Sequence, residues 1–337
     1  MEPIAYWLPV VWAALLGIGV VMYVLLDGFD LGIGILFLTG TGEAERDHMM
    51  NSVAPYWDGN ETWLVLGGAG LLVAFPLAYG VIMPALYLPL IGMLLALVFR
   101  GVAFEFRFVS KPRNRWWDRA FAIGSTIATF CQGLVLGGFL QDIPVTDRQF
   151  SGGSFDWATP FSFLCGFGLI SGYALLGSGW LMTKTEGELA ARARRHARIA
   201  LVLTLCFIIA VSAWTPLVSS RIEERWFGGN HLLYLWPIPL ATATVALICW
   251  AGISKSSGLQ TFLSAMALFL LCFLGLGVST FPYLVPPTLT IWDAAAVPQS
   301  QIFSLIGALL FLPLVLAYTA FVYWTFRGKV TEGGGYH

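Results

Sequence analysis

WLPVVWAALLGIGVVMYVLLDGFDLGIGILFL, residues 7–38, is a long apolar run whose only charged residues are Asp27 and Asp30. A helix that crosses the hydrocarbon core of a membrane needs about 20 mostly apolar residues. At about 1.5 Å per residue this run is about 48 Å long as a helix, which exceeds the thickness of the core. It also lacks the basic lead and small-residue cleavage site of a signal peptide. We therefore expect a retained membrane helix over 8–38, with both carboxyl groups toward its cytoplasmic third.

The whole chain has the composition of a protein that crosses the membrane many times. Of its 337 residues, 58% are hydrophobic and 11% are charged, whereas soluble domains carry about 25% charged residues. A soluble fold of this size could not bury so much apolar surface. The net charge is −1 and neither end carries a long charged tail, which argues against nucleic acid as a partner.

Nine apolar runs are long enough to cross a bilayer, and together they predict one transmembrane domain of all-α fold over 1–337. We expect helices over about 8–38, 60–78, 81–100, 120–140, 160–182, 198–219, 232–252, 259–280 and 302–326. The second and third runs are separated only by Tyr79-Gly80, which predicts a tight turn there. The remaining loops are modest in length and leave no room for a separate soluble domain.

The distribution of Lys and Arg predicts how these helices are oriented. If the loops alternate between the two sides, all but three of the 18 Lys and Arg residues lie on one side, the exceptions being Arg148, Arg221 and Arg225. Loops rich in Lys and Arg stay in the cytoplasm. The N-terminus is therefore expected on the periplasmic side and the C-terminus in the cytoplasm, an arrangement that nine crossings produce and eight do not.

Residue types that usually bind metals are missing from the predicted membrane interior. Haem iron is usually held by His, sometimes with Met or Cys, but the four histidines lie in predicted loops, at a helix boundary or at the last residue: His48, His196, His231 and His337. The five cysteines share no CxxC spacing and are interpreted as small apolar side chains. The sequence also contains no P-loop, dinucleotide fingerprint or HExxH motif. We expect this chain to bind no metal of its own.

Acidic residues in the first helix are the first candidate site. Asp27 and Asp30 lie on nearly one helical face, and Gly28 and Gly32 form a small-xxx-small pair that allows a second helix to approach closely. An ionisable group inside a membrane is costly and is a functional hypothesis by default. Two interpretations stay open: the aspartates bond structurally to neighbouring backbone or an arginine, or they take part in proton movement.

NSVAPYWDGNETWLV, residues 51–65, holds a second polar group at the start of the second predicted helix. Asp58 precedes Glu61 by three residues, a spacing that favours a helix-capping role. Trp57 and Trp63 are typical of interfacial anchors. Against these structural interpretations, the segment places Asp58, Asn60 and Glu61 between two indoles at one membrane boundary.

VFRGVAFEFR, residues 98–107, places Glu105 just beyond the predicted inner end of the third helix. With Arg100 and Arg107 nearby, the simplest interpretation is an ion-paired glutamate at the interface. The functional alternative is a carboxyl group at the mouth of a hydrated path.

Four of these segments together resemble a known family. DGFDLGIG (27–34), NSVAPYWDGNETWLV (51–65), RGVAFEFR (100–107) and TIWDA (290–294) are similar to subunit II of cytochrome bd-type quinol oxidases. The resemblance covers essentially the whole chain, and the first two segments are long and specific together. The terminal GGGYH (333–337) resembles the cyanide-insensitive branch of the family.

The resemblance implies a bacterial inner-membrane enzyme that oxidises quinol and reduces oxygen to water. Two b-type haems and haem d, or a b-type haem in its place, are then held by subunit I. Subunit II is expected to be haem-free, with two four-helix bundles and one peripheral helix, and to pack against subunit I. Quinol and lipids are further expected partners. The sequence leaves open whether a small single-helix subunit joins the complex and whether a quinone binds this chain.

The resemblance also assigns roles to individual residues. Asp58 matches the aspartate of the family's WDGN segment, on a proton route from the cytoplasm toward the oxygen-reducing haem. Glu105 stands where relatives carry Asp, so its side chain is one methylene longer. With Asp27 and Asp30 extending the route, the expected supporting residues are Trp57, Asn60, Glu61 and Arg100. Trp57 is also the candidate contact for a quinone or lipid.

Two other functions are compatible with intramembrane carboxylates. A proton-coupled secondary transporter would use them together with helices broken by Pro or Gly. However, the acids gather in the first three predicted helices, with no matching charged set in the fifth to eighth. A purely structural chaperone for subunit I is the other alternative.

Overall fold

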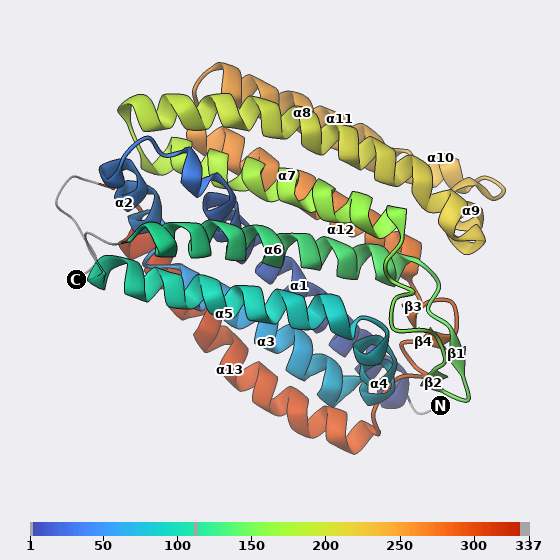
Figure 1. Ribbon diagram of the computed structural model, residues 1–337. Coiled ribbons are helices and arrows are strands. Elements are labelled where there is room, and N and C mark those ends of the chain that lie inside the picture. Colours follow the sequence, from blue (N-terminus) through green and yellow to red (C-terminus); the bar gives the residue numbers. More distant parts are fainter. Residues whose placement is uncertain (1–2, 111–113, 331–337) are drawn as a thin grey trace.

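The computed structural model describes residues 3–110 and 114–330, which form a bundle of long helices (Figure 1). The helices are α1 (Pro3–Leu36), the 3-10 turn η1 (Phe37–Thr39), α2 (Glu43–Asn51), α3 (Trp57–Ala74), α4 (Pro76–Ala85), α5 (Tyr87–Val109), α6 (Arg115–Leu140), α7 (Pro160–Lys184), α8 (Gly187–Val218), α9 (Ser220–Phe227), α10 (His231–Leu235), α11 (Pro237–Ser254), α12 (Gly258–Thr280) and α13 (Pro298–Thr325). Two short hairpins complete the fold: β1 (Val145–Thr146) with β2 (Gln149–Phe150), and β3 (Tyr283–Val285) with β4 (Leu289–Thr290).

The connections between long helices gather at the two ends of the bundle (Figure 1). One end, at the left of the figure, holds α2, the end of α5, the start of α6, the turns from α7 to α8 and from α11 to α12, and residues 326–330 after α13. The opposite end holds the start of α1, both hairpins, α4, α9 and α10. We call these the α2 end and the hairpin end. Among the described residues, Lys184, Arg192, Arg194, Arg195 and Arg198, at the end of α7 and the start of α8, lie at the α2 end.

Eight helical segments in the described part of the chain are long and apolar enough to cross a membrane. They are Ile4–Thr39, Tyr87–Val109, Arg115–Leu140, Pro160–Lys184, Gly187–Val218, His231–Ser254, Gly258–Thr280 and Pro298–Thr325. This confirms the all-α membrane class. The predicted crossing over 60–78 is not among these eight segments. It corresponds to most of α3 and the start of α4; α3 has 18 residues, begins with the polar WDGNET segment and lies beside α1.

The predicted tight turn at Tyr79-Gly80 is wrong. Both residues lie inside α4, and the chain breaks instead at Phe75 and again at Leu86. Pro76 occupies the first turn of α4, where its missing N–H costs nothing, and it disfavours helical geometry at Phe75. A proline therefore sets the boundary that the Tyr-Gly pair was expected to set.

Two further boundaries differ from the sequence-based expectation. α8 begins at Gly187 and not near residue 198, because the ARARRHAR segment continues the apolar helix as a charged extension. α5 continues to Val109, so that Glu105 lies within a helix and not beyond its end. The two short hairpins were not expected from the apolar runs because they lie in loops between them.

A glycine seam joins α1 to α7 and confirms the close approach that the small-xxx-small pair predicts. A side-chain carbon added at Gly28 would collide with the ring of Tyr173, and one added at Gly32 would meet the Tyr173 carbonyl. Gly177 lies equally close to the backbone of Gly32. Larger residues on either helix would separate the two backbones, so these glycines fix where α7 lies against α1.

α13 lies at the edge of the bundle and is held mainly at its two ends. At the hairpin end, Gln301 donates to the Ala74 carbonyl and its own carbonyl accepts from Trp12. At the α2 end, the buried Lys184 ammonium donates to the carbonyls of Phe326 and Gly328. Much of the surface of α13 between these anchors is exposed and apolar. The GGGYH tail lies outside the described residues.

Candidate functional site

The centre of the candidate site is an ionic cluster buried between α1, α3 and α5. The Arg100 side chain is fully buried, and its Nη1 lies 3.0 Å from Asp27 Oδ1 and 3.4 Å from Glu61 Oε2. Asp27 is also fully buried, whereas the Glu61 side chain is 29% exposed. Glu61 therefore connects the buried Asp27–Arg100 pair to the surface of the chain.

Asp30 belongs to a second, adjoining set of polar groups. Its Oδ2 accepts a 2.7 Å hydrogen bond from the amide nitrogen of Asn60, which also donates to the Leu26 carbonyl. The Asn60 side-chain oxygen in turn accepts from the hydroxyl of Tyr323 on α13. Asn60 thus ties α1, α3 and α13 together around Asp30.

Several atoms of the cluster lack a direct hydrogen-bond partner among the described residues. They are Asp27 Oδ2, Asp30 Oδ1, and Nε and Nη2 of Arg100, all of them buried. Each buried polar group without a partner costs free energy, so its presence in a folded protein needs an explanation. The cluster therefore keeps spare donors and acceptors at its buried centre.

Toward the hairpin end, a chain of hydroxyl and amide groups continues from the cluster. Tyr23 precedes Asp27 by one helical turn, and its hydroxyl accepts a 2.7 Å hydrogen bond from Gln132 of α6. Gln132 accepts in turn from the hydroxyl of Tyr173 on α7. The polar groups therefore reach from α3 and α5 across α1 to the seam between α1 and α7.

Asp58 lies on the surface in the first turn of α3, and the capping role that its spacing favours is wrong. The residue that caps α3 is Tyr56, which makes no side-chain capping hydrogen bond. Asp58 precedes Glu61 by three residues, so that both carboxyls lie along the same side of α3. Trp57 is half-buried, stacks on Phe104 and lies 5.9 Å from the Arg100 guanidinium, which gives it a packing role beyond that of an interfacial anchor.

Glu105 is exposed on α5, and the interfacial ion pair expected for it is absent within residues 3–110 and 114–330. Both arginines nearest in sequence point elsewhere: Arg100 to Asp27 and Glu61, and Arg107 to Asp47 and Asp118. On a helix, a residue five positions after Arg100 lies on a different face. The structure thus separates Glu105 from the buried cluster.

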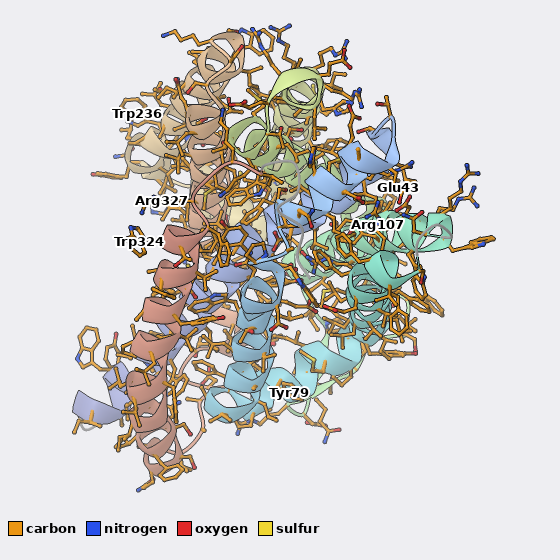
Figure 2. All side chains as sticks on the ribbon, turned by 90° about the vertical axis from the view of Figure 1, so that its left-hand side faces the viewer. Glu43, Tyr79, Arg107, Trp236, Trp324 and Arg327 are labelled. Carbon is orange, nitrogen blue, oxygen red and sulfur yellow. The ribbon has the colours of Figure 1, made fainter. Side chains whose placement is uncertain are left out.

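A second ionic group fixes the α2 end of the bundle. The fully buried Arg107 guanidinium lies 2.6 Å from Asp118 of α6 and pairs with Asp47 of α2. Figure 2, which looks at this end, shows Arg107 and Glu43 on neighbouring elements. Nearby, Glu45 accepts from the amide and hydroxyl of Thr41 and from Arg192 of α8. Partial burial alone would raise the pKa of Glu45, but these hydrogen bonds hold that pKa below its usual value.

Lys184 and Tyr56 form a further buried polar contact at this end. The Lys184 ammonium donates to the Tyr56 hydroxyl, which itself donates to the Phe326 carbonyl at 2.6 Å. Burial, together with the charge of Asp30, raises the pKa of Tyr56 to about 12. Tyr56 therefore stays protonated at neutral pH and keeps its role as a donor to the segment after α13.

The described residues contain no group of three or more His, Cys, Asp or Glu side chains placed to hold a metal ion. His48 is in α2, His196 in the charged first part of α8, and His231 is exposed at the start of α10. His337 lies outside the described residues. The five cysteines are free, and Cys131, Cys165 and Cys249 are buried in apolar surroundings, as their interpretation as small apolar side chains predicts.

Sequence reasoning found part of this site. It named Asp27, Asp30, Asn60, Glu61 and Arg100, which the structure brings together, and it named Asp58 and Glu105, which lie on the surface. It missed Tyr23, although its spacing of four residues from Asp27 on one helix indicates a shared face. It also missed Gln132, Tyr173 and Tyr323, for which no local pattern gives a signal because their partners lie far away in sequence.

Comparison with known proteins gives one consistent result. Residues 8–326 match the family described as cytochrome bd terminal oxidase subunit II. The chain is 30% identical to cytochrome bd-I ubiquinol oxidase subunit 2 of Escherichia coli (strain K12), covering 96% of this chain and 95% of that protein. It is 28% identical to cytochrome bd ubiquinol oxidase subunit 2 of Bacillus subtilis (strain 168), covering 95% and 96%.

A solved structure shares the fold. The bd oxidase from Geobacillus thermodenitrificans includes a chain that aligns with a TM-score of 0.72 at 17% identity, covering 94% of this chain and 99% of that one. The sequence matches extend over nearly the full length of both partners, so they are not confined to one motif. The chain belongs to the family of cytochrome bd terminal oxidase subunit II.

Proposed function

We propose that this chain is the haem-free subunit II of a bacterial quinol oxidase that reduces oxygen to water, and that it supplies a proton path to the haem-bearing subunit I. The names of the relatives support the activity, since they are subunits of ubiquinol oxidases. The proton path is supported by the site itself.

The observation that carries the proton path is the continuity from surface to interior on α3. Asp58 is exposed, Glu61 is partly exposed one turn later, and Glu61 contacts the buried Arg100, which pairs with Asp27. Carboxyl groups spaced in this way can take up a proton at the surface and pass it inward. In this proposal Asp58 collects the proton, Glu61 transfers it, and Asp27 and Asp30 hold it inside.

The Arg100 guanidinium gives this arrangement its electrostatic basis. A cation beside a buried carboxyl favours the ionised form, whereas burial favours the protonated form. Opposed effects of this kind leave a carboxyl able to exist in either state, as a proton relay requires. Glu105, on a separate face, would act as a second surface carboxyl at the same end and not as a step of the buried path.

The distribution of potential ligands supports placing the haems in the partner subunit. Axial haem ligands are usually His, with Met, Cys or Tyr in some classes. In the described part of this chain no His lies within the apolar core of the bundle. The two b-type haems and haem d, or its b-type substitute, are therefore assigned to subunit I, where their chemistry takes electrons from quinol to oxygen.

The same proposal includes the membrane arrangement. α3 together with α4 forms a ninth crossing between α1 and α5, so that the N-terminus is periplasmic and the α2 end is cytoplasmic. α1, α3, α5 and α6 then form one four-helix bundle and α7, α8, α11 and α12 the other. α13 is the peripheral helix, and its exposed apolar surface is available to a partner subunit or lipid.

The proton path is tested by Asp58→Asn and Glu61→Gln in the intact two-subunit oxidase. Both substitutions keep size and polarity but remove the titrating group. We expect quinol oxidase turnover to fall at least about tenfold, because general acid–base groups contribute about that much or more. Proton uptake should fall in parallel, with haem content and subunit stoichiometry unchanged. Glu188→Gln, an exposed carboxyl at the start of α8, is the matched control.

Different outcomes separate the alternatives. Unchanged turnover in both variants would contradict the proton path and indicate a purely structural subunit. Reduced assembly with normal turnover per complex would indicate a chaperone role. A stoichiometric Soret absorption in the isolated chain would contradict the haem-free assignment. Substrate-dependent proton flux by the chain alone in vesicles would instead favour a proton-coupled transporter.

A further inference from the structure

A pocket of about 360 Å³ lies at the α2 end of the bundle, far from the carboxylate cluster. One wall is the beginning of α8, with Arg194, Arg195 and Arg198. Met182 at the end of α7 and Ser256 in the turn between α11 and α12 also line the pocket. Figure 1 shows these three segments converging at the same end of the bundle. The proposed proton path uses none of them.

The arginines of the pocket differ in how far they are engaged. Arg194 has a structural partner, since its guanidinium donates to the carbonyls of Ile253 and Ser254 at the end of α11. Arg195 and Arg198 are exposed and form no ion pair with a residue in 3–110 or 114–330. The pocket thus has one cation held in place and two that are free to bind an anion.

None of the described residues that line the pocket is acidic. Of the carboxyls close in sequence, Glu186 is paired with Lys329, and Glu188 does not line the pocket. Gly187 and Ala190, from the first turn of α8, form part of the wall. The start of a long helix presents unpaired N–H groups and the positive end of its dipole, both of which favour an anion.

Directly beyond the arginines, α8 offers an apolar surface. Arg195 and Arg198 are followed on the same exposed stripe, at spacings of three and four residues, by Ile199, Val202, Leu203, Cys206 and Ile209. Each of these side chains points away from the bundle. Two cations followed along one helix by an exposed apolar stripe match the shape of a phospholipid, with its charged head group at the membrane surface and its acyl chains alongside the helix.

We infer that this pocket is a binding site for the head group of an anionic phospholipid at the cytoplasmic surface of the membrane. Basic pockets between membrane helices on this side are where anionic head groups bind. The methyl and thioether groups of Ala190, Ala191 and Met182 would contact the glycerol region, while Arg195 and Arg198 bind the phosphate. This site rests on the proposed membrane arrangement, in which the α2 end is cytoplasmic, but not on the proposed proton path, which uses other helices.

The test measures lipid retained by the purified two-subunit oxidase. After delipidation, the complex is titrated with dioleoylphosphatidylglycerol or with zwitterionic dioleoylphosphatidylcholine, and bound lipid is counted by native mass spectrometry. The variant is the double substitution Arg195→Gln and Arg198→Gln. We expect one phosphatidylglycerol to bind about 25-fold more weakly, since each arginine near an anionic head group contributes about fivefold. Binding of phosphatidylcholine should not change.

Two further variants make the result interpretable. Arg115→Gln with Arg119→Gln removes two exposed arginines from the same end of the bundle and should retain phosphatidylglycerol as the wild type does. Arg195→Lys with Arg198→Lys keeps the charge and should restore most of the binding. Thermal midpoints of all complexes establish whether each variant is folded. We expect them to be unchanged, because neither Arg195 nor Arg198 has a described ion pair to lose.

Four results would overturn the inference. The Gln variant could retain phosphatidylglycerol as the wild type does, or the control pair could lose it equally. Phosphatidylcholine could bind as tightly as phosphatidylglycerol. Finally, inorganic phosphate at millimolar concentration could displace the lipid completely, which would identify the pocket as a site for free phosphate and not for a membrane lipid.

Discussion

Arg100 is the residue on which the buried site depends. It lies on α5, is fully buried, and contacts Asp27 of α1 and Glu61 of α3. An isolated charge in this position would be very costly, so that the guanidinium and the carboxyls must be present together. The centre of the site is thus one guanidinium shared by the carboxylates of Asp27 and Glu61 from two other helices.

Removing that cation should destabilise the oxidase. Arg100→Met leaves Asp27 buried without its counter-ion, and breaking a buried pair costs about 3–5 kcal/mol. We expect a lower thermal midpoint and a smaller yield of assembled complex, measured by fluorescence-detected size exclusion after heating. Arg119→Met, which removes an exposed arginine, should have little effect. A wild-type midpoint for Arg100→Met would show that Asp27 is neutral in the folded protein.

The helices are positioned by small contacts at a few points. Gly32 allows α1 to touch the backbone of α7, and Lys184 joins the end of α7 to the segment that follows α13. Figure 2 shows Trp324 and Arg327 at this end of α13, where the guanidinium of Arg327 lies 5.0 Å from the ring of Trp324. These contacts join α1 to α7 and the end of α7 to the segment after α13.

The glycine seam predicts a size limit at Gly32. In Gly32→Ala the added methyl group would meet the Tyr173 carbonyl, so that α1 and α7 must separate. Overpacking of this kind costs about 1–3 kcal/mol, and we expect a corresponding fall in the thermal midpoint. In Gly80→Ala the added methyl meets nothing within 4 Å, so this control in α4 should be near neutral. Equal effects of the two substitutions would refute the seam.

The Lys184 contact predicts local loosening of the chain after α13. In Lys184→Met the carbonyls of Phe326 and Gly328 lose their shared donor. Hydrogen–deuterium exchange should therefore become faster in residues 324–330 and stay unchanged in α1 and α3. Lys255→Met, at an exposed lysine after α11, serves as the control. Unchanged exchange would mean that Lys184 does not hold the segment after α13 in place.

On the scale of the whole molecule, the membrane arrangement depends on whether α3 and α4 together cross. Ala44 in α2 precedes them, and Ser154 follows α6. With a crossing at α3 and α4, the segments α3–α4, α5 and α6 separate the two residues, which then lie on opposite sides of the membrane. Without it, only α5 and α6 separate them, and both residues lie on the same side.

Cysteine labelling distinguishes these arrangements. In intact spheroplasts, a membrane-impermeant maleimide should label Ser154→Cys, whereas Ala44→Cys should be labelled only after permeabilisation. The native cysteines lie within membrane-spanning helices, so the wild type measures background. Labelling of both introduced cysteines from the same side would contradict nine crossings. Labelling of Ala44→Cys alone in intact spheroplasts would show that the chain has the opposite orientation to the one proposed.

The sequence could predict those parts of the fold that depend on local patterns. Apolar runs predicted six of the eight membrane-spanning segments nearly as they are, whereas α5 and α8 have other boundaries. Gly28 and Gly32 indicated a close helix contact that the structure confirms. The pattern failed at Tyr79-Gly80, where hydropathy alone could not distinguish a turn from the interior of α4. There Pro76 and its preceding residue determine the break.

The sequence by itself determined that this protein lies in a membrane, and it identified the acidic residues that stand within apolar runs. Its apolar composition requires a membrane, and carboxyls in such runs stand out because burying them there is costly. Only the tertiary structure decided which acids meet. Asp27, Glu61 and Arg100 come from three helices, and their contact depends on how α1, α3 and α5 pack, whereas Glu105 is turned away on the same helix as Arg100. Helix packing is a long-range property, so no local spacing could show that Glu61 connects the surface to the buried pair.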